Sequence, residues 1–213
     1  MLVKQIMTQD VVTVAPNDTL WQADQLLMKG RFRHLPVVEA GRLVGIVSDR
    51  DIRIPLFLNS RETALQTMQQ KQIRQIMRQP VMTASPLMAI EQAAAIMYEN
   101  KIGCLPVLEN DRLVGIITES DIFRAFIQIM GVMLPSSRLQ LLLDDGPEPL
   151  AKVTHIVKDH GVNIVSLVTE PCQTAGKRIV VVRLQTIDPR PIISELQRAG
   201  IEISSPELLW RQS

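Results

Sequence analysis

Aromatic residues and cysteines are scarce in this chain of 213 residues. Aromatic side chains make up only 3% of it, so the core must be built from aliphatic residues and from the ten methionines, whose flexible side chains fill gaps between packed elements. The two cysteines, Cys104 and Cys172, form no CxxC pair, which argues against a disulfide framework and a zinc site. With 46% hydrophobic and 21% charged residues, the composition is that of a globular protein.

An excess of one charge and a long apolar run are also missing. The formal net charge is +1, which gives no general attraction to nucleic acid or to a membrane surface, so we expect neither as a partner. No stretch reaches the roughly 18 apolar residues of a membrane span. The first residues, MLVKQIMTQD, lack the apolar segment of a signal peptide. We therefore expect a cytoplasmic protein.

Short strings that mark common catalytic sites do not occur. The sequence contains no HExxH, GxSxG or GxxxxGKS, which are signatures of metalloproteases, serine hydrolases and phosphate-binding loops. His155 and His160 are five positions apart, so they do not share a helix face as a metal-binding pair would. We predict no metal and no catalytic residue, and we expect a protein that is not an enzyme.

An internal repeat organises the first two thirds of the chain. When the sequence is shifted by 70 positions, it matches itself without a gap, and about 20 of 49 aligned positions are identical. The longest identical run is Arg42–Ile46 with Arg112–Ile116, and Leu35–Val37 also matches Leu105–Val107. We predict a first copy at residues 1–70, a second copy at 71–135 and a separate domain at 136–213.

Each copy is predicted to have the order β-α-β-β-α. In the first copy, Asp18 or Thr19 can cap a helix that runs to about Lys29, and Gly41 supplies the left-handed residue of a tight turn. The strands are expected at 11–14, 35–39 and 43–47, with a second helix after Ser48. The same elements are expected at 81–84, 88–99, 105–109, 113–117 and from 119 onward. A unit of this size has too small a core to stand alone, so two copies are expected to pack together.

The last segment has a different pattern. It alternates strands at 138–143, 163–170, 177–185 and 201–204 with helices at 149–160 and from Asp188, the expected N-cap, to about Ala199. The order βαββαβ predicts a ferredoxin-like domain, so the fold class of the whole chain is α+β.

The repeat resembles the CBS motif family. The resemblance rests on Leu35–Val37 with Gly45–Asp51, and on Leu105–Val107 with Gly115–Asp121. It implies a paired module, often called a Bateman module, with two clefts that bind an adenosine-containing ligand such as AMP or ATP, with NADH or S-adenosylmethionine as further possibilities. CBS motifs followed by the last segment also resemble the acetoin-utilisation B-type proteins.

The last segment itself resembles an ACT domain from Leu143 to Ile164. The family commonly has Pro-Gly-x-Leu at the first turn, whereas this chain has Pro147-Glu148-Pro149-Leu150. The Glu148 carboxylate would repel the carboxylate of an amino-acid ligand. A packing or dimerisation role is therefore expected for this domain.

Binding residues are expected from the chemistry of a nucleotide. A ribose diol needs a carboxylate acceptor, for which Asp51 and Asp121 are the candidates, three positions after Ser48 and Thr118. The spacing Ser-x-x-Asp is equally typical of a capping box, which needs no ligand. The resemblance favours a ligand role.

The remaining candidates supply cations and an apolar slot for the base. Phosphate binding is assigned to basic residues, mostly of the first copy, with Arg50 foremost: Arg31, His34, Arg50 and Lys101. The slot for the base is assigned to residues of the strands: Val11, Val12, Thr13, Pro36 and Ile46 in the first copy, and Val81, Met82, Thr83, Pro106 and Ile116 in the second. The basic residues of the first copy predict that its cleft favours phosphorylated ligands.

Two functions are consistent with these features. The favoured one is a regulatory protein whose clefts bind an adenosine-containing ligand and modulate its assembly or a metabolic enzyme partner. The alternative is a structural or interaction protein with vestigial clefts that acts through homodimerisation. Both resemblances imply at least a dimer.

Overall fold

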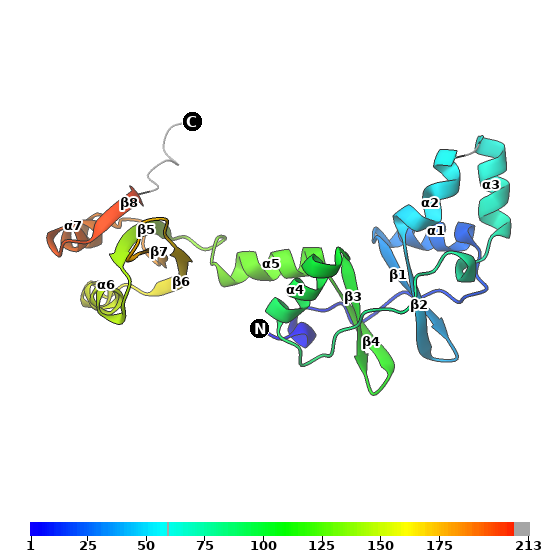
Figure 1. The fold of residues 1–213 in the computed structure, drawn as a ribbon, viewed down its shortest axis with the longest axis horizontal. Helices are drawn as coiled ribbons and strands as arrows, with labels where there is room; N and C mark the ends of the chain where they lie inside the picture. Colours follow the sequence, from blue (N-terminus) through cyan, green and yellow to red (C-terminus); the bar gives the residue numbers. More distant parts are fainter. Residues whose placement is uncertain (59, 207–213) are drawn as a thin grey trace. The chain divides into compact units, whose positions relative to one another are not determined.

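A computed structural model describes residues 1–58 and 60–206, and it divides into two compact units, Met1–Phe123 and Arg124–Ser213 (Figure 1). The division falls within α5 (Glu119–Ile129), earlier than the predicted boundary at 135/136. Part of the segment before the predicted boundary belongs to the second unit, because Ser166 Oγ in β6 (Ile164–Pro171) donates to the Met130 carbonyl at 2.9 Å. Among the described residues, no helix combines the length and apolarity that crossing a bilayer requires.

The first copy contains a β-hairpin and three α-helices. Its elements are a short 3-10 turn η1 (Val3–Gln5), α1 (Leu20–Gly30), β1 (His34–Glu39), β2 (Arg42–Ser48), α2 (Asp49–Leu58) and α3 (Arg61–Gln70). Thr19 is the N-cap of α1, as predicted: its Oγ1 accepts from the Gln22 amide at 3.2 Å, and Gln22 Oε1 accepts from the Thr19 amide at 2.8 Å. Gly41 has φ +78 in the β1–β2 turn, which confirms the predicted left-handed residue.

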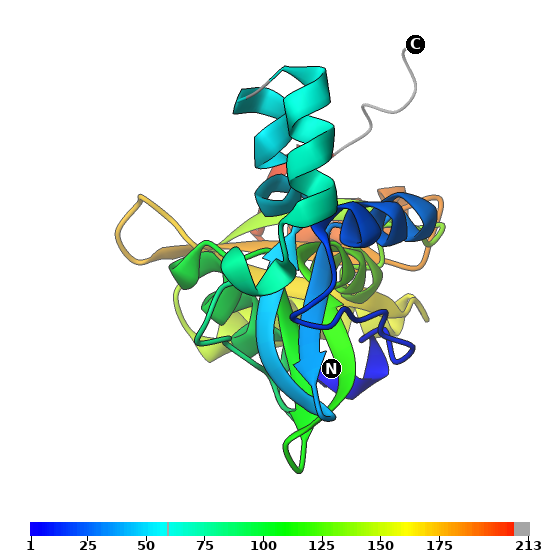
Figure 2. The ribbon, with the colours of Figure 1, turned by 90° about the vertical axis from the view of Figure 1, so that its right-hand side faces the viewer.

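The second copy repeats this arrangement. It contains η2 (Ile73–Gln75), α4 (Ile90–Asn100), β3 (Cys104–Glu109), β4 (Arg112–Thr118) and α5. Both hairpins are antiparallel, with the same register and a bulge at the same place, after Val37 and Val107. Both turns lie on the same side of this unit (Figures 1 and 2).

Two predictions about the copies need correction. The strands expected at 11–14 and 81–84 are wrong, because each segment forms only one bridge, between Val14 and Val37 or between Ala84 and Val107. Each segment crosses from the hairpin of the other copy to the hairpin of its own copy, and it pairs with its own hairpin only at its last residue. Helix α3 was not anticipated; it packs on α1 and α2 through buried Ala64 and Met68.

The residue three positions before each of these segments pairs with the hairpin of the other copy. Thr8 of the first copy bridges Ile116 in β4, and Arg78 of the second copy bridges Ile46 in β2. Ile73 of the second copy is fully buried within the core of the first. Each copy therefore forms its own two-stranded hairpin and adds one bridge to the hairpin of the other.

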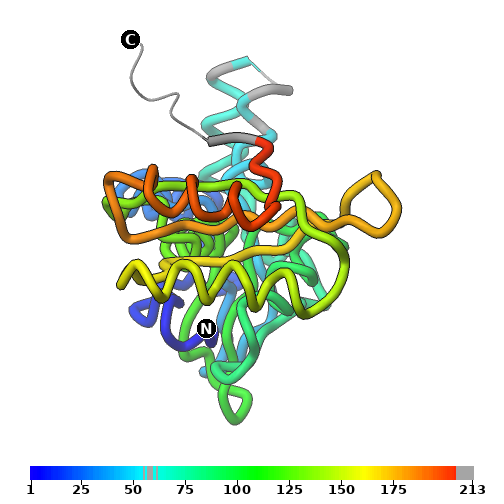
Figure 3. The backbone as a smooth tube through the Cα atoms, turned by 90° about the vertical axis from the view of Figure 1, so that its left-hand side faces the viewer, coloured from blue at the N-terminus to red at the C-terminus, as the bar shows by residue number. Residues whose placement is uncertain are grey.

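The second unit has the predicted βαββαβ order. Its elements are β5 (Ser137–Asp144), α6 (Pro147–Asp159), β6 (Ile164–Pro171), β7 (Lys177–Leu184), α7 (Arg190–Arg198) and β8 (Glu202–Pro206) (Figure 3). The strand order is β6-β7-β5-β8 with every neighbouring pair antiparallel, which is the ferredoxin-like arrangement.

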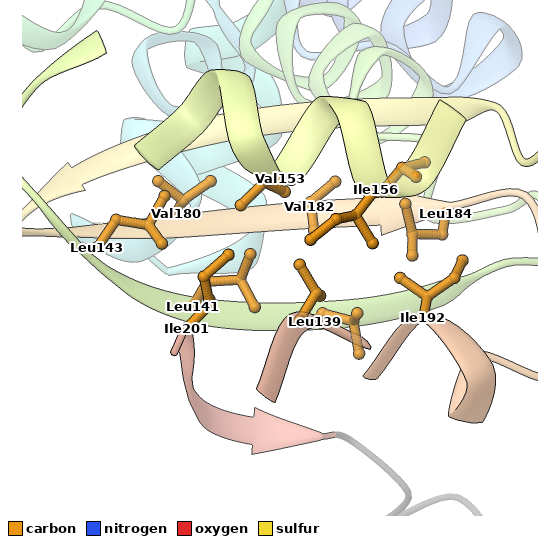
Figure 4. Packing of buried hydrophobic residues seen from close by; sticks show 12 residues of the cluster. Leu139, Leu141, Leu143, Val153, Ile156, Val180, Val182, Leu184, Ile192 and Ile201 are labelled. Carbon is orange, nitrogen blue, oxygen red and sulfur yellow. The ribbon is translucent and has the colours of Figure 1, made fainter. Parts of the chain in front are cut away.

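The core of this unit lies between the sheet and both helices. Alternate residues of β5 and β7 face Val153 and Ile156 of α6 and Ile192 of α7 (Figure 4). The N-cap prediction at Asp188 is off by one residue, because the N-cap of α7 is Pro189. The Asp188 carboxylate instead binds the amide and the guanidinium of Arg190 at 2.6–3.2 Å.

Candidate ligand-binding site

Asp51 lies where β2 passes into α2, and it is held there by Ser48. Ser48 Oγ donates to Asp51 Oδ2 at 2.6 Å, and the Ser48 amide donates to the same oxygen at 3.2 Å. The Asp51 amide in turn donates to Ser48 Oγ at 3.2 Å. These reciprocal bonds are those of a capping box, and they fix a carboxylate at the start of a helix.

Thr118 and Asp121 form the same arrangement where β4 passes into α5. Thr118 Oγ1 donates to Asp121 Oδ2 at 2.7 Å, and the Thr118 amide donates to this oxygen at 3.0 Å. Asp121 is 8% exposed, whereas Asp51 is half-buried. The expectation that each hydroxyl and carboxylate lie together at a helix start is confirmed in both copies.

Arg78 is the neighbour of Asp51 that the sequence analysis missed. Its Nη2 donates to Asp51 Oδ1 at 3.1 Å. Burial by itself would raise the pKa of Asp51, but the hydrogen bonds from Ser48 and Arg78 outweigh it and lower the pKa below its ordinary value. The carboxylate is therefore ionised at neutral pH. The signal was present in the repeat, since Met7-Thr8-Gln9 aligns with Met77-Arg78-Gln79 and only the middle position changes.

The predicted phosphate-binding cations are mostly on the surface. Arg31, Arg50 and Lys101 are exposed. Arg31 and Lys101 each follow a helix in a left-handed conformation, with φ of 54 and 53. Exposed cations of this kind are free to reorient toward an anion.

His34 lies against the second copy. A Cβ built at Gly103 would be 3.0 Å from His34 Cε1, and 3.6 Å from an oxygen of Glu119. Burial lowers the pKa of His34 below its ordinary value of 6.5, although Asp49 and Glu119 oppose this shift. His34 is therefore neutral at pH 7, when it can offer one hydrogen-bond donor but no charge to a phosphate.

The residues assigned to the base slot are unevenly placed. Pro36 and Pro106 are buried, and Ile116 is 9% exposed. Ile46, Val11, Thr13, Val81 and Thr83 are half-buried. Val12 and Met82 are 40% and 47% exposed.

A hollow of about 660 Å³ lies beside the two hairpin turns. Val11 and Thr13 line it, together with Arg42 and Arg112, but neither Asp51 nor Asp121 does. Arg42 begins β2 and Ser48 ends it, which separates them by about 20 Å at the usual rise per residue. The structure thus brings Val11 and Thr13 together, but not with Asp51.

Comparison with known proteins identifies the first unit. The family model for the CBS domain matches residues 3–56 and 71–128, which is one match for each copy of the repeat and more than half of the chain. The chain belongs to the CBS domain family. The two matches include both helix starts that carry Asp51 and Asp121, so these carboxylates lie at equivalent positions of the two CBS domains.

Solved structures of CBS proteins are also similar to this chain. One is the CBS domain pair of the protein MJ0100 in complex with 5′-methylthioadenosine and S-adenosyl-L-methionine, with 34% identity, 59% of this chain and 95% of that chain covered, and a TM-score of 0.52. A second is CBSX2 in complex with AMP, with 30% identity, 60% and 97% coverage and a TM-score of 0.52. A third is a protein from Vibrio cholerae assigned to acetoin utilization, AcuB, with 32% identity, 62% and 95% coverage and a TM-score of 0.53.

The described part of the chain contains no group of three or more His, Cys, Asp or Glu residues that could hold a metal ion. The two CBS domains instead offer carboxylates and hydroxyls, and Arg78 adds a cation beside Asp51. Such groups recognise hydroxyls and phosphates.

Proposed function

We propose that this CBS protein is a non-catalytic regulator whose Asp51 and Asp121 sites bind an adenosine-containing ligand. The observation that carries the proposal is the repeated geometry, in which a capped carboxylate stands at the start of the second helix in both CBS domains. CBS pairs of related structures hold AMP, 5′-methylthioadenosine and S-adenosyl-L-methionine. The shared part of these ligands is adenosine.

The carboxylate suits the ribose diol. Each Asp uses Oδ2 to accept from the hydroxyl and amide three positions earlier. A carboxylate has about four lone-pair positions, so a diol can donate to Oδ1, where it competes with Arg78 in the Asp51 site. A hydrogen bond of this kind to a charged group contributes about 1.5–3 kcal/mol, which makes each Asp the main determinant of adenosine binding.

Each site is completed by the partner copy. Arg78 bridges Ile46 in β2, the strand that leads to Asp51, so residues 78–83 begin beside the Asp51 site. Thr8 bridges Ile116 in β4, the strand that leads to Asp121, so residues 8–13 begin beside the Asp121 site. We assign the base at the Asp51 site to Val81, Met82 and Thr83, and the base at the Asp121 site to Val11, Val12 and Thr13. In this crossed assignment, the residues that contact the base come from one copy and the carboxylate that binds the ribose comes from the other.

Phosphates would be bound by exposed cations. Arg50 directly precedes Asp51 and is exposed, so it can reach an anion without losing a buried contact. At the Asp121 site the residue at this position is Ser120. We infer that the two sites differ in their preference for phosphorylated ligands.

The second unit would convert ligand binding into a change of assembly. Its ferredoxin-like topology and its resemblance to ACT domains support a role in dimerisation or in contact with a metabolic enzyme. In the first unit, Met28, Tyr98 and Phe123 are 61%, 86% and 68% exposed. Large exposed apolar side chains of this kind favour self-association.

Thermal unfolding with added ligands tests the proposal. AMP, ATP, NADH and S-adenosylmethionine are each added to the full chain, with inorganic phosphate as the control. A ligand at 100 times its Kd should stabilise the protein by about 2.7 kcal/mol, seen as a rise in Tm, and native mass spectrometry of the same sample reports the bound mass and the number of subunits. If none of the four ligands shifts Tm or adds mass, the sensory function is wrong and the vestigial-cleft alternative takes its place.

A further inference from the structure

The hollow beside the two hairpin turns is built from both CBS domains. Residues 40–42 of the β1–β2 turn and residues 110–113 of the β3–β4 turn line it, and the crossing segment adds Gln9, Val11 and Thr13. These three alternate along the chain, as residues on one side of an extended segment do. The volume of about 660 Å³ lies within the range of about 300–1,000 Å³ that is usual for pockets that bind small molecules.

Each hairpin turn contributes one arginine to this hollow. Arg42 begins β2 and Arg112 begins β4, so the two side chains hold equivalent positions of the repeat. Among the lysines and arginines of residues 1–58, only Arg42 is matched by an identical residue 70 positions later. The repeat therefore keeps a cation at the hairpin turns, whereas Arg50 beside the helix start is matched by Ser120.

Neither guanidinium is engaged by another part of the protein. Within residues 1–58 and 60–206, the side chains of Arg42 and Arg112 form no hydrogen bond or ion pair, although Glu39 and Glu109 are their register partners in the hairpins. Both arginines are exposed. An anion that enters the hollow can therefore bind them without breaking an existing ion pair.

The other polar groups of the lining suit an anion as well. Gln9, Thr13 and Asn110 supply amide and hydroxyl donors. Asp111 is the one carboxylate that lines the hollow. Two guanidinium groups against one carboxylate leave the lining with a net positive charge.

We propose that this hollow is a binding site for a small ligand that carries two anionic groups, one for each arginine. A guanidinium binds the oxygens of a phosphate or a carboxylate through two parallel N–H bonds, so a diphosphate or a dicarboxylate can engage both hairpins at once. Neither helix start that carries a ribose-binding carboxylate lines the hollow. The site is therefore additional to the adenosine sites and does not depend on them.

Calorimetric titration of the full chain with pyrophosphate, succinate and orthophosphate tests this site. A ligand with two anionic groups should bind about tenfold more tightly than orthophosphate, because it gains a second charged pair. Tighter binding of pyrophosphate than of succinate identifies phosphate groups as the preferred anion, and the reverse order identifies carboxylates.

Substitutions locate the bound anion. Arg42→Gln and Arg112→Gln each keep a polar side chain but remove one charge, and each should lower the affinity for the tighter of the two ligands by about tenfold, to the level of orthophosphate. The double variant should show no measurable binding. Arg74→Gln removes an exposed arginine of the same unit that does not line the hollow, and it should bind as the unsubstituted protein does. Melting curves establish that each variant is folded.

AMP titrated against the same variants separates this inference from the proposed function. AMP affinity should be unchanged in Arg42→Gln and Arg112→Gln, and a parallel loss of AMP affinity would overturn the independence of the site. If neither two-group ligand binds more tightly than orthophosphate, or if all three single variants bind it alike, the hollow is not a site for such a ligand. Binding of the two-group ligand without any binding of AMP would refute the proposed function alone.

Discussion

Replacing Asp51 and Asp121 together by asparagine is expected to remove measurable binding of adenosine-containing ligands. Asparagine keeps the oxygen that accepts from Ser48 or Thr118, so the helix starts are retained, but it loses the charge that strengthens the bond from a ribose hydroxyl. Each charged hydrogen bond is worth about 1.5–3 kcal/mol, which corresponds to a loss of about 10- to 150-fold at each site. Calorimetry with AMP measures this loss.

A control substitution distinguishes the loss of a carboxylate that binds the ligand from the loss of a carboxylate elsewhere in the same unit. Asp18 accepts from the Ala15 amide at 2.7 Å and belongs to the same unit, but it lies at neither site. Asp18→Asn should bind AMP as the unsubstituted protein does. Unchanged AMP affinity in the folded double variant would show that the carboxylates at the helix starts act only as caps.

Gly115→Ala is expected to destabilise the CBS pair by about 1–3 kcal/mol, the usual cost of a methyl group forced into a packed site. A Cβ at this position would lie 2.6 Å from Met7 Sδ and 3.0 Å from the Thr8 carbonyl oxygen. The methionine side chain can move aside, but the Thr8 backbone is held by its two hydrogen bonds to Ile116. The methyl group therefore clashes with the Thr8 backbone that pairs with β4, and the free energy of unfolding falls. Urea unfolding followed by circular dichroism measures this loss of stability.

Gly45 and Gly146 provide the comparison for this variant. A Cβ at Gly45 would lie 2.6 Å from Met77 Sδ and 3.1 Å from Met77 Cβ, and since Cβ is fixed to the backbone, Gly45→Ala should also destabilise the pair. Gly146 has an extended φ of 169 and no atom within 4 Å of a built Cβ, so Gly146→Ala should stay within about 0.5 kcal/mol. Equal stability of all three variants would argue against close packing between the copies.

Local features of the fold followed from the sequence. The hairpin turn at Gly41 and the cap at Thr19 were predicted because each depends on residues within a few positions of one another. The βαββαβ order of the second unit followed from its alternating pattern for the same reason. The pairing of Ser48 with Asp51, and of Thr118 with Asp121, was predictable from a spacing that places both side chains at one helix start.

Long-range features did not follow. Nothing local to Thr8 or Arg78 indicates that each pairs with the hairpin of the other copy, so the sequence pattern predicts strands at 11–14 and 81–84 that do not form. Helix α3 is polar along most of its length and is stabilised by packing of Ala64 and Met68, a tertiary contact that the pattern does not reveal. Arg78 was missed as a site residue because it is 27 positions from Asp51.

The same limit applies to the base slot. Residues of both copies were assigned by their own strands, whereas the exchange places residues 78–83 after the Asp51 site and residues 8–13 after the Asp121 site. A sequence repeat alone cannot distinguish a copy that completes its own site from one that completes its neighbour's site. The hydrogen bonds of Thr8 and Arg78 favour the crossed assignment that we propose.

A crystal structure of the protein grown with AMP tests the central claim most directly, because it locates the ribose. The account predicts the 2′- and 3′-hydroxyls on the carboxylate of Asp51 or Asp121, with the base beside residues 78–83 or 8–13. Nucleotide bound only in the hollow between Arg42 and Arg112, away from both carboxylates, would contradict it.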